Sequence, residues 1–481
     1  MTAKMGRGWL LAGAVLLSGY SACAQTLTLK DGDVEVGIDA KGNLTSLRNA
    51  RTGREYAAGR PLWRLYFDRK DGEKEIPVLG AENVPSVSQE GGRIVLRYGA
   101  LKARGVELKM RLTLTVRIED GLARFGSEVA NEEPHTVIRE LHYPLVGGCR
   151  LAAGDKLLTT FAGGQLFAEP VKRIAAVGNN PPYMAPSQFY RQMDLKYPSH
   201  TWGNCFAFVG EAEGLYLGSH DPTFQDTWHG LRVYPDAAGA FSELEAGLYK
   251  YPNCLAGQTW ACDANVIAPY SGSWHQTAKI YRKWADTWWH PREVPRWVRL
   301  MKGWQRVIFT HQYGERLFAY GDLDGRMRRA GESVGVNAVL AFAWWQSGMD
   351  NGYPDCYWMT DPAQGGDAGW GAAVKSFRAN NGRLLLYFNG KLIDEESAFY
   401  KSGEGQKICY RDNFGAQYTE QYRFKGMGTF TGLYNARTFV VANTRRPEWR
   451  QKLLAMADRA IAFGADSVFY DQLGYCEPST D

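Results

Sequence analysis

The feature that most constrains this 481-residue chain is a change of hydrophobic period near Pro295. Before that point apolar and polar residues alternate with a period of two, and after it continuous apolar runs alternate with helical faces. The clearest alternating run extends from Val106 to Ile118 and predicts a strand with one buried face and one solvated face. The two regions therefore predict different fold classes within one chain.

The first region, residues 25–270, is interpreted as a large antiparallel β-sandwich. Shorter alternating runs at 34–38 and 94–98 are bounded by pairs such as Asp31-Gly32 and Asp120-Gly121. These pairs suit the tight turns of β-hairpins, because Gly and Asp tolerate the backbone conformations that such turns need. Many short strands joined by turns predict a sandwich.

A helix is expected to connect the two regions over residues 271–295. Trp274, Tyr281 and Trp288 recur there at helical spacing, and His290-Pro291 should end the helix. The aromatic stripe predicts that this connecting helix packs between two domains.

Residues 296–481 have an α/β rhythm. Four apolar runs, at 303–309, 338–342, 384–388 and 467–470, are separated by amphipathic helices. Such runs indicate parallel strands that helices cover on both faces.

Four strands fall short of a closed barrel of the TIM type, which has eight and typically needs about 250 residues. We therefore expect a TIM-type (β/α) barrel that is truncated on its C-terminal side, with about four strands present. A small open sheet is the alternative. Truncation of a barrel would leave parallel edge strands unpaired, which native folds usually avoid.

The first 24 residues are typical of a signal peptide. Lys4 and Arg7 precede an apolar run, and Ala22-Cys23-Ala24 supplies the small residues of a cleavage site near Ala24. A lipoprotein cut before Cys23 is the competing interpretation, and Tyr20 disfavours it. No later run is long enough for a membrane span, so we expect a periplasmic or secreted protein.

The sequence also argues against several partners and cofactors. The formal net charge is only +5, and two of the cations lie in the leader, so no nucleic-acid partner is expected. No histidine pair has zinc-binding spacing, and neither a Walker loop nor a strand-linked GxGxxG is present. The GxSxG match at 331–335 ends a helix before a strand, which reverses the order of a nucleophile elbow. We therefore expect no metal and no cofactor.

Two weaker possibilities stay open at this point. Cys254 and Cys262 could form a disulfide in an oxidising compartment, and buried free thiols fit their positions equally. Asp350, Asp355 and Asp361 share one segment and could hold calcium, although solvated loop acids are the preferred interpretation.

The residues around the strand ends of the second region suggest a sugar site. Aromatic residues make up 13% of the chain, and their rings stack on the apolar faces of sugars. Barrel enzymes build their active sites where strands end, and glycoside cleavage requires carboxylates beside groups that hold a sugar. Asp471, which ends the last run, is the predicted catalytic carboxylate. The substrate-binding candidates are Trp304, His311, Trp344, Trp345, Asp350, Asn389, Asp394 and Gln472.

The first region contributes two further substrate-binding candidates, His220 and Asp221. They lie in a loop-rich patch that also contains Trp202 and Trp228. The alternative is that this patch consists of packed aromatics around a hydrogen-bonded histidine.

Four segments together resemble a secreted bacterial glycoside-hydrolase-like family of unknown function. They are GLYLGSHD at 214–221, YRKWA at 281–285, LYFNG at 386–390 and VFYDQLG at 468–474. The family joins an N-terminal β-sandwich to a catalytic (β/α)8 barrel, an architecture similar to that of retaining α-glycosidases of the α-galactosidase type. The resemblance implies that Asp471 is the nucleophile at the end of strand four. It also implies that the acid/base residue lies on strand six, beyond residue 481.

The sequence therefore predicts an exported retaining glycosidase that acts on an oligosaccharide or polysaccharide. A non-catalytic carbohydrate-binding protein, or an inactive fragment of the hydrolase, is the alternative. A polysaccharide lyase centred on the sandwich is a third hypothesis, and it would need a base such as His220 near an Arg and a Tyr.

Overall fold

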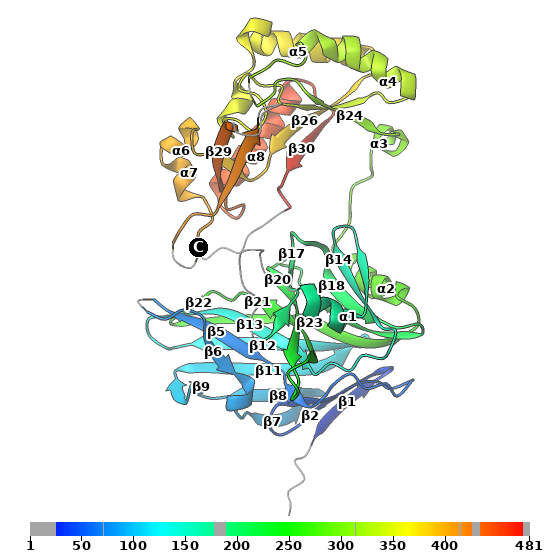
Figure 1. The fold of residues 1–481 in the computed structure, drawn as a ribbon, viewed down its shortest axis with the longest axis vertical. Coiled ribbons are helices and arrows are strands. Elements are labelled where there is room, and N and C mark those ends of the chain that lie inside the picture. The colour runs from blue at the N-terminus through cyan, green and yellow to red at the C-terminus, as the bar shows by residue number, and fades with distance from the viewer. Residues whose placement is uncertain are drawn as a thin grey trace, which may run out of the picture.

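The computed structural model describes residues 26–70, 72–177, 189–312, 314–412, 415–425 and 433–474. The chain forms two lobes, an antiparallel β lobe followed by a smaller α/β lobe (Figure 1). The proposed signal peptide lies outside the described residues. Among the helices of the described residues, none is long and apolar enough to cross a membrane.

The first lobe is a sandwich of two large antiparallel sheets. Tyr143 of one sheet donates its hydroxyl to the carbonyl of Thr115 in the other over 3.0 Å, and its ring meets Phe125 edge-on. The nine-stranded sheet has the order β15 (Gln165–Ala168), β14 (Lys156–Phe161), β18 (Thr201–Val209), β19 (Glu213–Ser219), β23 (Gln258–Ser271), β12 (Leu122–Asn131), β11 (Met110–Glu119), β8 (Arg93–Tyr98) and β7 (Ser86–Glu90).

The eight-stranded sheet faces it and carries short flanking strands. Its members are β16 (Arg191–Gln192), β20 (Thr227–Pro235), β21 (Phe241–Lys250), β13 (Thr136–Gly147), β5 (Arg64–Arg69) and β6 (Ile76–Leu79), with β17 (Leu195–Tyr197) on β20 and β22 (Cys254–Leu255) on β13. The remaining elements are β1 (Leu27–Asp31), β2 (Val34–Ile38), β3 (Asn43–Asn49), β4 (Arg60–Pro61), η1 (Gly80–Glu82), β9 (Leu101–Ala103), β10 (Val106–Leu108) and α1 (Pro170–Val177).

The strand predicted over 106–118 is two strands. The chain passes from β10 to β11 at Lys109, and Val106 is exposed rather than buried. Within β11 the alternation holds as expected, because Met110, Leu112 and Leu114 are fully buried against the opposite sheet. An unbroken alternation of apolar and polar residues therefore does not show where one strand ends and the next begins.

The connecting helix α2 (His275–Ala285) packs on the sandwich and not between two domains. Trp284 stacks on His220 with ring centroids 5.0 Å apart, and Trp288 meets Phe224 edge-on. Trp274, expected on the same stripe, is half-exposed. The short helix α3 (Arg296–Leu300) then leads into the second lobe.

The second lobe contains the four predicted strands as one parallel sheet in the order β24 (Trp304–Ile308), β25 (Ala338–Phe342), β26 (Arg383–Asn389) and β30 (Ser467–Asp471). Each strand therefore lies next to its neighbour in the chain. Helices α4 (Arg328–Val334), α5 (Gly366–Ala379) and α8 (Pro447–Ala462) connect them, and α5 buries Trp370, Val374 and Phe377. Gly335 ends α4 in a left-handed conformation with φ of +68°, which favours glycine.

Within the described residues this sheet is open, with β24 and β30 at its edges. The prediction of four parallel strands is confirmed. The sheet does not itself show a TIM-type barrel, so the barrel stays a prediction.

The segment from 390 to 438 contains most of a second small sheet. β27 (Leu392–Asp394), β29 (Leu433–Val441) and β28 (Thr419–Lys425) form an antiparallel sheet in the order β27-β29-β28, accompanied by α6 (Ala398–Lys401) and α7 (Glu404–Lys407). Short 3-10 or π turns complete the lobe: η2 (Tyr320–Asp322), η3 (Leu323–Met327), η4 (Asp355–Trp358) and η5 (Pro362–Gln364).

Cys254 and Cys262 are both buried and form no disulfide with each other. The structure thus favours buried thiols over the disulfide that we considered. Cys476 lies outside the described residues.

Candidate active site

The candidate site lies where β26 and β30 end. Parallel pairing places Asn389, the last residue of β26, directly opposite Asp471, the last residue of β30. The amide of Gly390 donates to the carbonyl of Asp471 over 2.8 Å and extends this pairing past the strand ends. Residues that follow the two strands therefore gather at one edge of the sheet.

Asp471 is held by a tyrosine from the neighbouring strand. The hydroxyl of Tyr387 donates to Asp471 Oδ2 over 2.8 Å, and the Tyr387 ring stacks on Phe342 with centroids 3.8 Å apart. Burial, followed by the negative charge of Asp471, raises the pKa of Tyr387, so its hydroxyl keeps its proton and remains a donor. The Asp471 carboxyl is half-buried and its orientation is fixed.

Asp350 supplies a second carboxyl at the same edge. It follows β25 in a left-handed conformation with φ of +54°, and Tyr353 donates its hydroxyl to Asp350 Oδ1 over 2.9 Å. Burial is the main cause that raises the pKa of Asp350, and the charge of Asp471 raises it further. Arg306, on β24, opposes the shift. Asp350 and Asp471 are therefore two carboxyl groups that interact electrostatically, which is typical of catalytic sites.

The inserted small sheet contributes a side wall. Gln472 donates Nε2 to the hydroxyl of Tyr422 over 2.7 Å, and Tyr422 donates that hydroxyl to Glu420 over 3.2 Å. Glu420 in turn pairs with the buried Lys391 at 2.7 Å. Gln472 Oε1 is buried, and within the described residues it accepts no hydrogen bond.

Asn389 and Asp394 have structural roles in the turns that follow their strands. Asn389 Oδ1 accepts the amides of Lys391 and Leu392 at 3.0 and 2.8 Å. The fully buried Asp394 accepts the amides of Gly352 and Glu396 at 2.7 and 2.9 Å. Both were expected to bind substrate, but these oxygens already hold the loops around the site in place.

Trp344 and Trp345 are core residues. Both are fully buried, so neither can form a wall for a sugar ring. Trp344 stacks on Trp370, and Trp345 donates its indole N–H to the carbonyl of Gly348 over 2.6 Å. The expectation was wrong because the chain continues from β25 into the interior, where the two indoles support the site from beneath.

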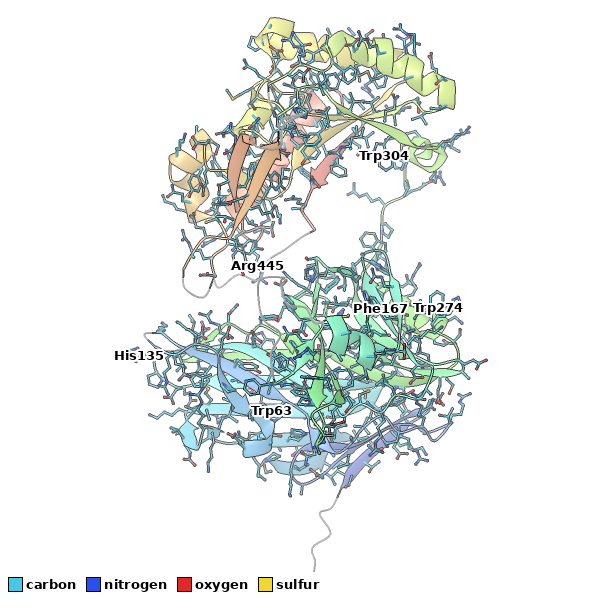
Figure 2. All side chains as sticks on the ribbon, in the orientation of Figure 1. Trp63, His135, Phe167, Trp274, Trp304 and Arg445 are labelled. Carbon is cyan, nitrogen blue, oxygen red and sulfur yellow. The ribbon has the colours of Figure 1, made fainter. Side chains whose placement is uncertain are left out.

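The structure places Trp304 and His311 at opposite ends of β24. Trp304 (labelled in Figure 2) is the first residue of the strand, opposite Ala338, and is 55% exposed. It therefore lies at the amino edge of the sheet, away from Asp471. His311 follows the strand at the carboxyl edge and is half-buried. The amide of Met349 donates to the carbonyl of Thr310, the residue before His311, over 3.0 Å.

His220 and Asp221 belong to the interior of the sandwich lobe. His220 is 5% exposed and bonds to the hydroxyl of Tyr216 over 2.8 Å, and burial lowers its pKa to about 3. Asp221 forms a buried ion pair with Lys250 at 3.1 Å. These contacts make the pair part of the packed core and do not support the lyase hypothesis, because a base must reach its substrate.

The three aspartates considered for calcium point to separate partners. Asp355 accepts the amide of Phe399 over 2.9 Å, Asp361 pairs with Arg316, and Asp350 bonds to Tyr353. Among the described residues no group of three or more His, Cys, Asp or Glu side chains could hold a metal ion.

Sequence reasoning missed the tyrosines of the site. Tyr387 lies within the apolar run of β26, where it counted as one more hydrophobic residue, and Tyr422 lies in the unpredicted β28. Tyr387 could have been identified from its position two residues before the end of a buried strand, because from there its hydroxyl reaches the edge of the sheet.

Comparisons with known proteins find similarity both in sequence and in structure. Residues 261–481 match the model of a domain of unknown function, DUF6259. Over 309 residues the chain is 26% identical to a Monosiga brevicollis protein named "Putative glycoside hydrolase 22789", which covers 57% of this chain. The chain spans about a quarter of the length of that relative.

Similar solved structures include the α-N-acetylgalactosaminidase NagBb from Bifidobacterium bifidum. Its complex with GalNAc superposes with a TM-score of 0.64 at 13% identity, over 94% of this chain and 71% of that one. The ligand-free form gives a TM-score of 0.63 at 12% identity, over 95% and 72%. This chain therefore shares, across both of its lobes, the fold of a glycoside hydrolase.

Proposed function

We propose that the chain is an exported retaining glycoside hydrolase in which Asp471 is the nucleophile. The observation that carries the proposal is the pair formed by Asp471 and Asp350 at the carboxyl edge of the parallel sheet. Tyr387 orients the first carboxyl, and the pKa of the second is raised. The glycosidase fold shared with NagBb supports the same function.

The chemistry assigned to Asp471 is attack on the anomeric carbon. One carboxyl oxygen forms a bond to that carbon while the glycosidic C–O bond breaks, and the departing oxygen takes up a proton from an acid. Water then displaces Asp471 and releases the sugar with its original configuration. A carboxylate already held by Tyr387 loses little conformational freedom when it attacks.

Asp350 is assigned to substrate binding beside the nucleophile. Tyr353 donates to Oδ1 of this carboxyl, and Oδ2 can accept a hydrogen bond from a sugar hydroxyl. Gln472, the residue after Asp471, places its amide at the same edge of the sheet. Together these groups suit the hydroxyls of one sugar ring, and the named neighbours make α-linked galactose-type sugars the first substrates to try.

A non-catalytic carbohydrate-binding protein, or an inactive fragment of the hydrolase, is the alternative function. Trp344 and Trp345 are buried and Trp304 lies at the other edge, so these three indoles form no sugar platform beside Asp471 for either function. The feature that favours the hydrolase is the carboxyl pair at the strand ends.

The test is to trap the glycosyl–enzyme intermediate. The full chain is incubated with 2-deoxy-2-fluoro glycosyl fluorides of galactose and glucose, digested and analysed by mass spectrometry. We expect one added glycosyl group on the peptide that contains Asp471. Asp471→Ala should lower hydrolysis of aryl α-galactosides and α-N-acetylgalactosaminides by several orders of magnitude.

Asp458→Asn is the matched control, since Asp458 is an exposed aspartate on α8 of the same lobe. It should leave hydrolysis unchanged. Labelling of a different carboxylate, or full activity of Asp471→Ala, would show that the nucleophile is assigned wrongly.

A further inference from the structure

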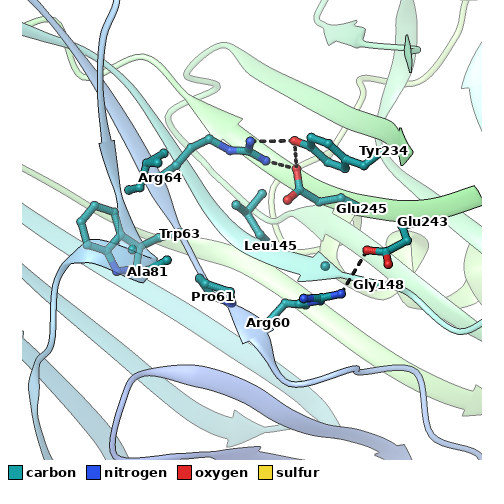
Figure 3. A pocket seen from close by; sticks show the side chains of 13 residues that line it. Arg60, Pro61, Trp63, Arg64, Ala81, Leu145, Gly148, Tyr234, Glu243 and Glu245 are labelled. Carbon is teal, nitrogen blue, oxygen red and sulfur yellow. Dashed lines mark hydrogen bonds and ion pairs between the residues drawn. The ribbon is translucent and has the colours of Figure 1, made fainter. Parts of the chain in front are cut away.

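We propose that the sandwich lobe carries a second carbohydrate site, which binds a single neutral pyranose residue. The site is a cavity of about 260 Å³ on the eight-stranded sheet, drawn in Figure 3. It is formed by β4 and β5 on one side and by β13, β20 and β21 on the other. It lies in a different lobe from Asp471 and does not depend on the function proposed above.

Two arginine–glutamate pairs form the polar part of the cavity. Arg60 pairs with Glu243 at 3.0 Å, and Arg64 pairs with Glu245 while donating to the hydroxyl of Tyr234 over 2.8 Å. A guanidinium has five N–H donors and a carboxylate has two acceptor oxygens, so these contacts leave capacity for a ligand. Adjacent donors and acceptors are what the vicinal hydroxyls of a sugar require, since each hydroxyl both donates and accepts.

The charge of the lining favours a neutral ligand. Among the thirteen lining residues the charged ones are Arg60, Arg64, Glu243 and Glu245, two cations and two anions. An anionic ligand would lie near two carboxylates and a cationic ligand near two guanidiniums, so each would be repelled by like charge. A neutral molecule with several hydroxyl groups is repelled by neither set of charges.

The rest of the lining is apolar or lacks side chains. Pro61, Leu79 and Ala81 supply the accessible apolar surface, against which the C–H face of a pyranose can pack, and the buried Trp63 and Leu145 support it from within (Figure 3). Gly147 and Gly148 leave the floor open. A Cβ atom on Gly147 would lie 2.8 Å from Cβ of Arg60, so any side chain there would displace that arginine.

The volume limits the ligand to about one ring. Pockets for drug-sized ligands typically measure about 300–1,000 Å³, and this cavity lies just below that range. A terminal sugar or one residue of a longer glycan fits these dimensions, and the rest of the glycan would extend into solvent past the exposed rim at Arg60 and Glu243.

The experiment is a titration of the full chain, labelled at leucine methyl groups, followed by NMR. The probes are methyl galactoside and methyl glucoside, with methyl glucuronide and methyl glucosaminide as charged comparators of the same size. We expect the methyl signals of Leu79 and Leu145, which line the cavity, to shift saturably with at least one neutral sugar. The charged sugar of the same configuration should bind more weakly.

The variant that tests the site is Arg60→Ala/Glu243→Ala. Both side chains are half-exposed, so the fold should tolerate their loss, and we expect affinity to fall by about ten-fold or more. Arg111→Ala/Glu132→Ala is the matched control, because it removes an equally exposed pair from the other sheet of the sandwich. That control should bind as the parent does.

Three results would overturn the proposal. They are no shift at Leu79 or Leu145 with either neutral sugar up to its solubility limit, unchanged affinity in Arg60→Ala/Glu243→Ala, and tighter binding of a charged comparator. Because the readout is local to the cavity, sugar bound near Asp471 would not be mistaken for it.

Discussion

Tyr387 and Asp471 lie on neighbouring parallel strands, and the phenol of one donates to the carboxylate of the other over 2.8 Å. The contact joins the residue proposed to attack the sugar to a ring that is itself packed on Phe342. A hydrogen bond to a charged group contributes about 1.5–3 kcal/mol, so its loss should be measurable in the rate.

Tyr387→Phe should lower kcat/KM by about ten- to a hundred-fold, because the ring is kept while the donor to Asp471 is lost. Steady-state kinetics on an aryl glycoside measures the effect. Tyr470→Phe is the control, since Tyr470 lies on β30 beside Asp471 but bonds to the carbonyl of Leu453. Equal losses in the two variants would show that the effect is not specific to the nucleophile.

Asp350→Asn should raise KM by about ten-fold or more and should do so equally for substrates with good and poor leaving groups. The reason is that a residue that binds the sugar acts before the bond breaks, whereas an acid matters most for a poor leaving group. Kinetics on a dinitrophenyl glycoside and on the corresponding alkyl glycoside provide the comparison. If only the alkyl glycoside is affected, Asp350 protonates the leaving oxygen, and our assignment is wrong.

Trp344→Ala should destabilise the α/β lobe by about 3–5 kcal/mol, because a fully buried indole leaves a large cavity. Trp304→Ala, at an exposed indole of the same lobe, should change the free energy of unfolding by less than about 1 kcal/mol. Urea denaturation measures both. Trp304→Ala should also leave hydrolysis unchanged, and a loss of activity there would place Trp304 in the site after all.

The stability of the sandwich should respond to acid through His229. Burial lowers the pKa of this fully buried histidine to about 3, from an ordinary value of 6.5, and its ring bonds to Asn204 over 3.1 Å. Below pH 6.5 the unfolded chain therefore binds a proton that the folded chain does not, and stability falls as the pH is lowered.

His229→Gln removes this proton uptake. The destabilisation it causes should be complete above pH 6.5 and should shrink by about 2 kcal/mol between pH 7.5 and pH 5, because only the parent loses stability over that range. Urea denaturation at the two pH values measures the difference. A destabilisation that stays constant with pH would mean that His229 titrates normally in the folded protein.

The four strands of the α/β lobe could be predicted because each is a continuous apolar run bounded by helical patterns. The nucleophile candidate could be predicted for the same reason, since Asp471 ends such a run. What the pattern does not contain is the direction of the side chains after the strand ends. Trp344 and Trp345 come just after β25, and Asp471 is the last residue of β30. The two tryptophans are nevertheless buried in the core.

The small sheet β27-β29-β28 could not be predicted for a different reason. Its strands pair across long separations in the chain, and β27 is only three residues long, so it has no period to detect. Tyr422 and Glu420 were missed with it. Local patterns report which residues are extended, but not which distant segment pairs with them.

The hydrogen bond between Gln472 and Tyr422 suggests where related proteins with this fold can vary in sequence. It joins the small sheet β27-β29-β28 to the residue immediately after Asp471, whereas the parallel strands lie in other segments of the chain. Changes in this small sheet would alter which sugars bind near Asp471 without disturbing the parallel sheet. Relatives that differ in sugar preference should therefore differ most between residues 390 and 440.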